Sequence, residues 1–141
     1  MIMGFYRTPS PNNKYYLPKE EYLTAVHYAL RYPYLLEELN TIANADTSQA
    51  ITYDKDKVSS SNQSDATAKT AILRAELTDK IKKISESIQE AAQSEDDENY
   101  LRLHVCYGFN YWQLVGKGMK CGQYQFSNMR QFFYYSLAKK I

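Results

Sequence analysis

The C-terminal stretch YLRLHVCYGFNYWQLVGKGMKCGQYQFSNMRQFFYYSLAKKI, residues 100–141, decides the fold of this chain. Glycines between residues 108 and 122 divide it into three segments whose apolar residues recur at helical spacing. Because glycine adopts the left-handed conformation without steric cost, it commonly ends helices. The stretch therefore predicts three short helices, at about 98–107, 110–116 and 123–139.

The last two predicted helices have the dimensions of a helix-turn-helix, since a short glycine-containing turn joins them. Asn110 stands at the start of the first of the pair, where an asparagine side chain caps a helix N-terminus. We expect the apolar residues of the longer helix to form a core with three residues of the preceding segments. The predicted core residues are Val105, Trp112, Val115, Phe126, Met129, Phe133 and Leu137.

The charges of the chain are divided unevenly. Residues 99–141 contain six Lys and Arg and no Asp or Glu, whereas residues 1–98 contain 11 basic and 16 acidic residues. The formal net charge of +1 therefore conceals a basic C-terminal piece on an acidic body. A polyanion responds to such a local charge, so this division favours nucleic acid as the partner of the C-terminal helices.

Several further features follow one another along the chain. They are a Tyr-Pro step at 32–33 with Leu39 after it, the run SDATAKTA at 64–71, YWQLV at 111–115, and the pattern of Gln125, Phe126, Arg130, Phe133 and Leu137. In this order they resemble the RinA/ArpU-like family of phage and prophage transcriptional regulators, whose C-terminal part resembles the helix-turn-helix of sigma-factor region 4. The resemblance implies an all-helical, sequence-specific DNA-binding regulator in a bacterial host cell, with 123–139 as its recognition helix.

If helix 123–139 enters the major groove, exposed polar residues near its N-terminus should meet base edges. Gln and Asn amides can pair bidentately with adenine. The expected base contacts are Gln123, Tyr124, Gln125, Ser127, Asn128 and Gln131. Basic residues around them should meet phosphates, which orient a protein on DNA without specifying its sequence. The expected phosphate contacts are Lys117, Lys120, Arg130, Lys139 and Lys140.

Residues 19–95 are expected to form a helical scaffold. Helical spacing predicts one helix over about 19–31 and a second over about 33–44, with Pro33 in the first turn of the second. His27 lies near the apolar face of the first helix, and with no second ligand at metal spacing we expect it to be packed in the core.

Two polar segments flank these scaffold helices. Residues 1–18 contain three prolines and predict an extended N-terminal arm. This arm packs across a partner surface, stays mobile, or touches nucleic acid through its basic and aromatic residues, which are Tyr6, Arg7, Lys14, Tyr15 and Tyr16. Residues 44–66 are rich in Ser, Asp and Asn and predict a loop. Weak alternation within that loop would allow a short strand pair at Ile51, Tyr53 and Val58.

A long helix is predicted to begin after Ser64 or Asp65, either of which can cap it. Apolar residues follow at near-heptad spacing over about four turns. This stripe consists of Leu73, Leu77, Ile81, Ile84 and Ile88. Two interpretations stay open. The stripe could pack against other helices of the same chain, which should use part of it. It could also form the seam of a homodimer, in which two weakly binding recognition helices would share one operator.

Little in the sequence points to catalysis. It contains no phosphate-binding glycine loop, nucleophile elbow or zinc-protease motif, and its two Cys and two His lack metal-ligand spacing. We therefore expect no enzyme activity, no cofactor and no metal. No apolar run reaches the roughly 20 residues of a membrane span, and the N-terminus lacks a signal-peptide pattern, so we expect a cytoplasmic protein without a membrane partner.

The sequence thus predicts an all-α helical bundle with an arm at 1–18, a scaffold and possible dimerisation region at 19–95, and a helix-turn-helix region at 96–141. Its expected partner is double-stranded DNA, as a regulator of phage or prophage genes. The single arginine of the recognition helix, Arg130, keeps a second hypothesis open. In that hypothesis the same scaffold is a protein-binding module that inhibits or redirects a host protein, such as RNA polymerase or a defence factor.

Overall fold

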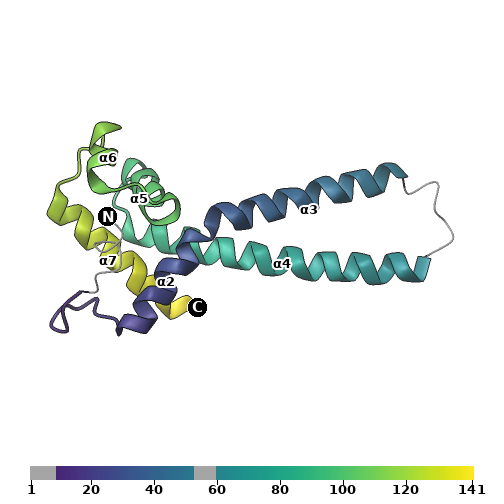
Figure 1. The fold of residues 1–141 in the computed structure, drawn as a ribbon, viewed down its shortest axis with the longest axis horizontal. Coiled ribbons are helices and arrows are strands. Elements are labelled where there is room, and N and C mark those ends of the chain that lie inside the picture. The colour runs from purple at the N-terminus through teal and green to yellow at the C-terminus, as the bar shows by residue number, and fades with distance from the viewer. Residues whose placement is uncertain (1–8, 53–59) are drawn as a thin grey trace. The chain divides into compact units, whose positions relative to one another are not determined.

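The computed structural model describes residues 9–52 and 60–141, with the side chains of residues 9–44 and 67–141. Within these ranges the chain forms six helices and no strand (Figure 1), so the predicted all-α fold is confirmed. The helices are α2 (Lys19–Leu30), α3 (Tyr32–Thr52), α4 (Ser60–Ala91), α5 (Glu95–Tyr107), α6 (Tyr111–Gly116) and α7 (Gln123–Lys140). They fall into two compact units, one holding the described residues up to Pro33 together with Lys83–Ile141, the other holding Tyr34–Lys82.

Helices α6 and α7 begin where they were predicted to begin, whereas α5 begins at Glu95, three residues before its predicted start at about 98. The Ser94 hydroxyl accepts a hydrogen bond from the Asp97 amide at 3.1 Å and so caps the start of α5. Four carboxylates in the first turn of α5 suit the positive end of the helix dipole. Gly108, with φ of 80°, ends the helix in the left-handed conformation, so the predicted glycine stop is confirmed.

The predicted polar loop at 44–66 is wrong over most of its length. Helix α3 continues to Thr52, and α4 already begins at Ser60, ahead of the predicted caps Ser64 and Asp65. Ser, Asp and Asn are only modestly unfavourable in helices, and adding a residue to an existing helix is far easier than nucleating one. Ile51 of the suggested strand pair belongs to α3, and Tyr53 and Val58 lie outside the described residues.

The first unit has a core built mainly on α7. Helix α2 packs against α7 and α5, and α5 also packs against α6 and α7. The core side chains of α5 to α7 are Leu101, Val105, Cys106, Leu114, Met119, Phe126, Met129, Phe133, Tyr134 and Leu137. The four predicted core positions of α7 are thereby confirmed. Trp112 and Val115 were predicted to join them but are 68% and 38% exposed, because the short helix α6 buries only Leu114.

The prediction that His27 packs in the core is also wrong. Its side chain is exposed, whereas Val26 and Ala29 on the same helix are buried. The apolar face of α2 is narrow, and position 27 falls outside it. The histidine that packs in the core is instead His104 of α5, which is 7% exposed.

The second unit consists of the larger part of α3 and the first part of α4, which run side by side in opposite directions (Figure 1). Leu35 of α3 and Leu77 of α4 are buried in this unit. The residues of the apolar stripe predicted on α4 therefore differ in how far they are buried. Leu77, Ile84 and Ile88 are buried, Ile81 is half-buried and Leu73 is 42% exposed, so internal packing accounts for part of the stripe, as expected.

Candidate nucleic-acid interface

Helix α6 is short, and reciprocal side-chain bonds fix its start. The Asn110 side chain accepts a hydrogen bond from the Gln113 amide at 2.8 Å, and the Gln113 side chain accepts one from the Asn110 amide at 2.8 Å. This capping box satisfies two backbone donors that a helix N-terminus leaves unpaired. The predicted N-cap at Asn110 is confirmed, and it fixes the residue at which α6 begins.

The turn between α6 and α7, residues 117–122, is held at both ends by tyrosines. The Tyr100 hydroxyl donates to the Lys117 carbonyl at 3.4 Å, and the Tyr111 hydroxyl donates to the Cys121 carbonyl at 2.8 Å. Gly118 takes φ of 107°, which allows the chain to reverse, and Met119 is buried beneath the turn. The two helices are therefore joined by a braced turn.

The predicted base contacts occupy the first turns of α7, and none of them is buried. Gln123, Gln125 and Asn128 are exposed, and Tyr124 is 82% exposed. Ser127 and Gln131 are half-buried. Had the amides been packed against the body of the protein, no base edge could have reached them. Their exposure leaves this face of α7 available to a partner.

Three of these side chains already make hydrogen bonds within the protein. The Gln125 amide donates to the Gln93 side chain at 3.0 Å, just beyond the end of α4. The Gln131 carbonyl oxygen accepts from Asn13 of the N-terminal segment at 3.0 Å, and its amide donates to Ser127 at 3.4 Å. Gln131 is therefore engaged by the arm, while Gln123, Tyr124 and Asn128 are the more accessible members of the set.

A groove of about 590 Å³ runs beside α7. Tyr124, Gln125 and Asn128 line one side of it, the arm residues Asn13, Lys14 and Tyr15 line another, and the end of α4 closes it. The sequence prediction did not place the arm here. The contacts are non-local, so helical periodicity carries no signal for them.

The predicted phosphate contacts divide into two groups. Lys117, Lys120 and Lys139 are exposed, and the ammonium groups of Lys117 and Lys139 lie 5.1 and 4.1 Å from the ring centroids of Phe109 and Tyr135. Arg130 is half-buried. Lys140 is tied to α4 and has less freedom to meet a phosphate.

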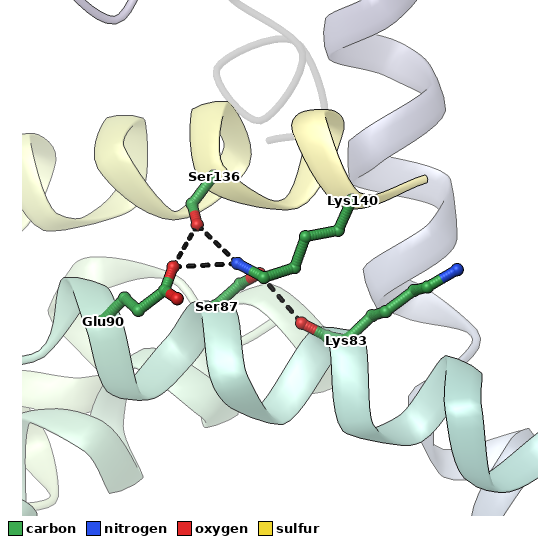
Figure 2. A network of polar contacts seen from close by, with 5 residues as sticks. All are labelled: Lys83, Ser87, Glu90, Ser136 and Lys140. Atoms are coloured by element: carbon green, nitrogen blue, oxygen red, sulfur yellow. Dashed lines mark hydrogen bonds and ion pairs between the residues drawn. The ribbon is translucent and has the colours of Figure 1, made fainter.

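Figure 2 shows the network that holds Lys140, with Ser136 and Lys140 of α7 facing Ser87 and Glu90 of α4. The Lys140 ammonium lies 2.8 Å from Glu90, 2.8 Å from Ser136 and 3.2 Å from Ser87. Ser136 also donates to Glu90. Hydrogen bonds from Lys140 and then Ser136 hold the pKa of Glu90 below its ordinary value. Lys140 therefore joins two helices of the first unit.

One carboxylate at the start of α5, that of Asp97, lies close to the turn. Burial is the main cause that raises the pKa of the Cys121 thiol, and the negative charge of Asp97 adds to it. Although no acidic residue follows Glu98 in the sequence, the folded chain thus brings Asp97 near the start of α7. The turn therefore has an acidic side chain beside it.

His104 is a buried polar residue beneath the interface. Its Nδ1–H donates to the Phe109 carbonyl at 2.6 Å, and its ring meets Phe126 edge-on. Burial lowers the pKa of His104 to about 4, so the imidazole is neutral at pH 7. It links the end of α5 to the segment that enters α6 and to the core face of α7.

The chain offers no assembled catalytic or metal centre among the side chains that the structure describes. No three His, Cys, Asp or Glu residues gather there as a metal site would require. Cys106 is buried, and burial raises the pKa of its thiol to about 12, which keeps it protonated and unreactive. None of the described helices has the length and apolarity to cross a membrane.

Comparison of the chain with protein-family models, with curated proteins and with solved structures finds no match.

Proposed function

We propose that α6 and α7 form the DNA-binding helix-turn-helix of a transcriptional regulator of phage or prophage genes. The observation that carries the proposal is the exposure of Gln123, Gln125 and Asn128 on the first two turns of α7. A helix that enters the major groove reads bases with its N-terminal residues, and amides are suited to adenine. The capped helix α6 and the braced turn support the proposal, because base reading needs a rigidly held helix.

The charges in this region agree with a polyanion as partner. Lys117, Lys120 and Lys139 are exposed, and no residue from 99 to 141 is acidic. Three accessible cations give a modest electrostatic attraction, since each phosphate contact contributes about 0.9 to the slope of log affinity against log salt. Tight binding to one site therefore calls for two copies of the chain or for a protein partner on the same DNA.

A binding titration of the full chain tests the proposal. The probe is duplex DNA carrying the sequence that flanks its own gene, measured against a scrambled duplex at two salt concentrations. We expect salt-dependent binding with a preference for the flanking sequence. The variant Gln123→Ala/Asn128→Ala removes two amides and should bind at least about 30-fold more weakly, because each good amide–base pair contributes about 1–3 kcal/mol of discrimination.

The matched control is Gln89→Ala/Asn40→Ala, which removes an exposed glutamine of α4 and an exposed asparagine of α3. It should bind as the wild-type protein does. Equal affinities of the two double variants, with both folded by circular dichroism, would show that α7 reads no bases. Absence of duplex binding at low salt would overturn the proposal outright.

A second function has its own support in the exposed aromatic residues of this region. Trp112 of α6 is 68% exposed and Tyr124 of α7 is 82% exposed. Trp and Tyr are the residues that most often anchor protein interfaces, and an exposed Trp is uncommon without a partner. The nearby Asp97 also suits a protein partner better than a duplex.

In this second function the region binds a host protein such as RNA polymerase. The two functions differ in their response to salt and to Trp112→Ala. If the region is a protein-binding module, Trp112→Ala should abolish a complex whose affinity changes little between low and high salt. If it binds DNA alone, Trp112→Ala should leave the base preference unchanged.

A further inference from the structure

Residues 10–16 of the N-terminal arm form a compact turn against α7. The Asn13 amide donates to the Ser10 carbonyl at 2.9 Å, and the Asn13 side chain accepts from the Tyr15 amide at 2.8 Å. Asn13 also donates to Gln131 of α7 at 3.0 Å. A single asparagine therefore both shapes the turn and attaches it to α7.

Tyr15 adds an aromatic attachment. Its ring lies edge-on to Phe132 with 5.2 Å between centroids, and 5.7 Å from the ring of Tyr135. Such aromatic pairs stabilise a contact beyond the burial of their area. The turn is thus fixed to the third and fourth turns of α7.

Residues 13–15 of the arm cover part of the outward side of α7, at its third and fourth turns, and leave its first turn exposed. The helix buries Phe126, Met129, Phe133 and Leu137 on its inner side. Positions 124, 128, 131 and 135 follow one another by four, three and four residues on the opposite side, so they form one stripe. The arm contacts this stripe at Gln131 and Tyr135, and Lys14 lines the same groove as Asn128. The arm therefore lies on the face that carries the predicted base contacts.

This arrangement brings together two lysines from opposite ends of the chain. The Lys14 ammonium lies 5.1 Å from the centroid of the Tyr15 ring, and the Lys139 ammonium lies 4.1 Å from that of Tyr135. The two rings are themselves 5.7 Å apart. Both lysines are exposed, and neither makes an ion pair with any residue that the structure describes. The acidic residue that lines the groove, Glu90, forms an ion pair with Lys140 at 2.8 Å.

We infer that Lys14 and Lys139 form a phosphate clamp for the DNA strand that borders the groove read by α7. A lysine held over a ring keeps N–H donors directed to solvent, and the cation–π contact helps to hold it there. Helix α7 has 18 residues and is about 27 Å long, whereas the major groove is about 12 Å wide. Only its first turns fit between the strands, so cations over its later turns meet the sugar-phosphate backbone.

The clamp rests on the proposed DNA-binding function and predicts something that function does not require, namely that the N-terminal arm takes part. The measured quantity is the slope of log affinity against log salt for the duplex used above. We expect Lys14→Ala and Lys139→Ala each to reduce the magnitude of the slope by about 1, and the double variant by about 2. The loss should be equal for the flanking and the scrambled duplex, because phosphates carry no sequence information.

Three further variants make the experiment specific. Lys82→Ala removes an exposed lysine of α4 and changes the net charge equally, so it should keep the wild-type slope if position matters. Lys14→Arg keeps the charge and should keep the slope. Tyr15→Ala leaves both lysines in the chain but removes the ring contacts that attach the arm, so it should reproduce the loss seen with Lys14→Ala.

Each outcome bears on the clamp. A double variant Lys14→Ala/Lys139→Ala with the wild-type slope would overturn it while leaving the proposed function standing, since base preference would persist. An equal loss of slope in Lys82→Ala would also overturn it, because net charge alone would then explain the effect. Failure of the wild-type chain to bind any duplex would overturn the proposed function and the clamp together.

Discussion

The ammonium of Lys140 lies 2.8 Å from the carboxylate of Glu90, which joins the last turn of α7 to the last turn of α4. The two residues are 50 positions apart in the sequence. Ser87 and Ser136 complete the network and give the ammonium further acceptors (Figure 2). Because the pair is partly exposed, its contribution to stability is limited by solvent screening.

Removing this ion pair should destabilise the protein slightly and in a pH-dependent manner. The pKa of Glu90 is held below its ordinary value of 4.5, mainly by the hydrogen bond from Lys140, so the folded state favours the ionised carboxylate. The resulting stabilisation is fully present above pH 4.5 and is lost as the pH falls through the lowered pKa. We expect Lys140→Ala to reduce the free energy of unfolding by about 0.5–1 kcal/mol at pH 7, measured by urea denaturation.

The control for this prediction is Lys139→Ala, which removes the neighbouring lysine that Glu90 does not contact. It should reduce stability less than Lys140→Ala at pH 7. A difference between the two variants that persists unchanged below the pKa of Glu90 would contradict the assignment of the effect to the ion pair.

His104 should make the stability of the protein fall as the pH is lowered from neutral. Burial depresses its pKa from 6.5 to about 4, so between these values the unfolded chain binds a proton that the folded chain does not. Stability therefore rises with pH across this window and is flat above it. A depression of this size corresponds to roughly 2–3 kcal/mol between pH 7 and pH 4.

The measurement for His104 has two parts. Urea denaturation between pH 4 and pH 7 should show the decline, and the ring resonances of His104 in the folded protein should stay those of a neutral imidazole with a proton on Nδ1 down to about pH 5. A His104 ring that becomes protonated near pH 6.5 in the folded protein would contradict the burial argument.

Most of the secondary structure in the C-terminal third could be predicted because its signals are local. Gly108 stops α5 by its left-handed conformation, and Asn110 caps α6 through bonds that reach only three residues. The spacing of Phe126, Met129, Phe133 and Leu137 defined the buried side of α7 without any knowledge of its neighbours. The exposed positions of the candidate interface followed from the same periodicity.

What the sequence could not predict depends on contacts between distant residues. Asn13 and Gln131 are 118 positions apart, and nothing local to either indicates that the arm lies on α7. His104 and His27 each lie near an apolar face, and only the packed structure distinguishes the buried one from the exposed one. The proximity of Asp97 to Cys121 likewise required the folded chain.

The turn between α6 and α7 should depend on Gly118 but not on Gly116. Gly118 has φ of 107°, which other residues rarely adopt, while an added Cβ would meet only the Tyr100 hydroxyl at 3.5 Å. The penalty is therefore conformational, and we expect Gly118→Ala to reduce the free energy of unfolding by about 1–3 kcal/mol. Gly116 is helical with open space around it, so Gly116→Ala should be neutral or stabilising by up to about 1 kcal/mol.

The comparison of these two glycines is made by chemical denaturation and by the DNA titration. If the braced turn positions α7, Gly118→Ala should also weaken duplex binding, whereas Gly116→Ala should leave it unchanged. Equal stability of the two variants would mean that the turn tolerates another conformation.

Trp112 should contribute almost nothing to folding, although its size and apolar character predicted a core position. Its side chain is 68% exposed and contacts Tyr111 edge-on at 5.0 Å between ring centroids. We expect Trp112→Ala to change the free energy of unfolding by less than about 0.5 kcal/mol, as surface substitutions usually do. Phe133→Ala, at a fully buried position of α7, should by contrast cost about 3–5 kcal/mol.

The effect of Trp112→Ala on binding shows whether the exposed tryptophan takes part in recognition. A folded Trp112→Ala protein that loses a partner, whether DNA or protein, would show that the residue is exposed because it is used in recognition. A large loss of stability in Trp112→Ala would instead mean that the ring is packed in solution and that α6 is oriented differently. Chemical denaturation and one binding titration on the same preparation separate these outcomes, because folding and recognition are then read independently.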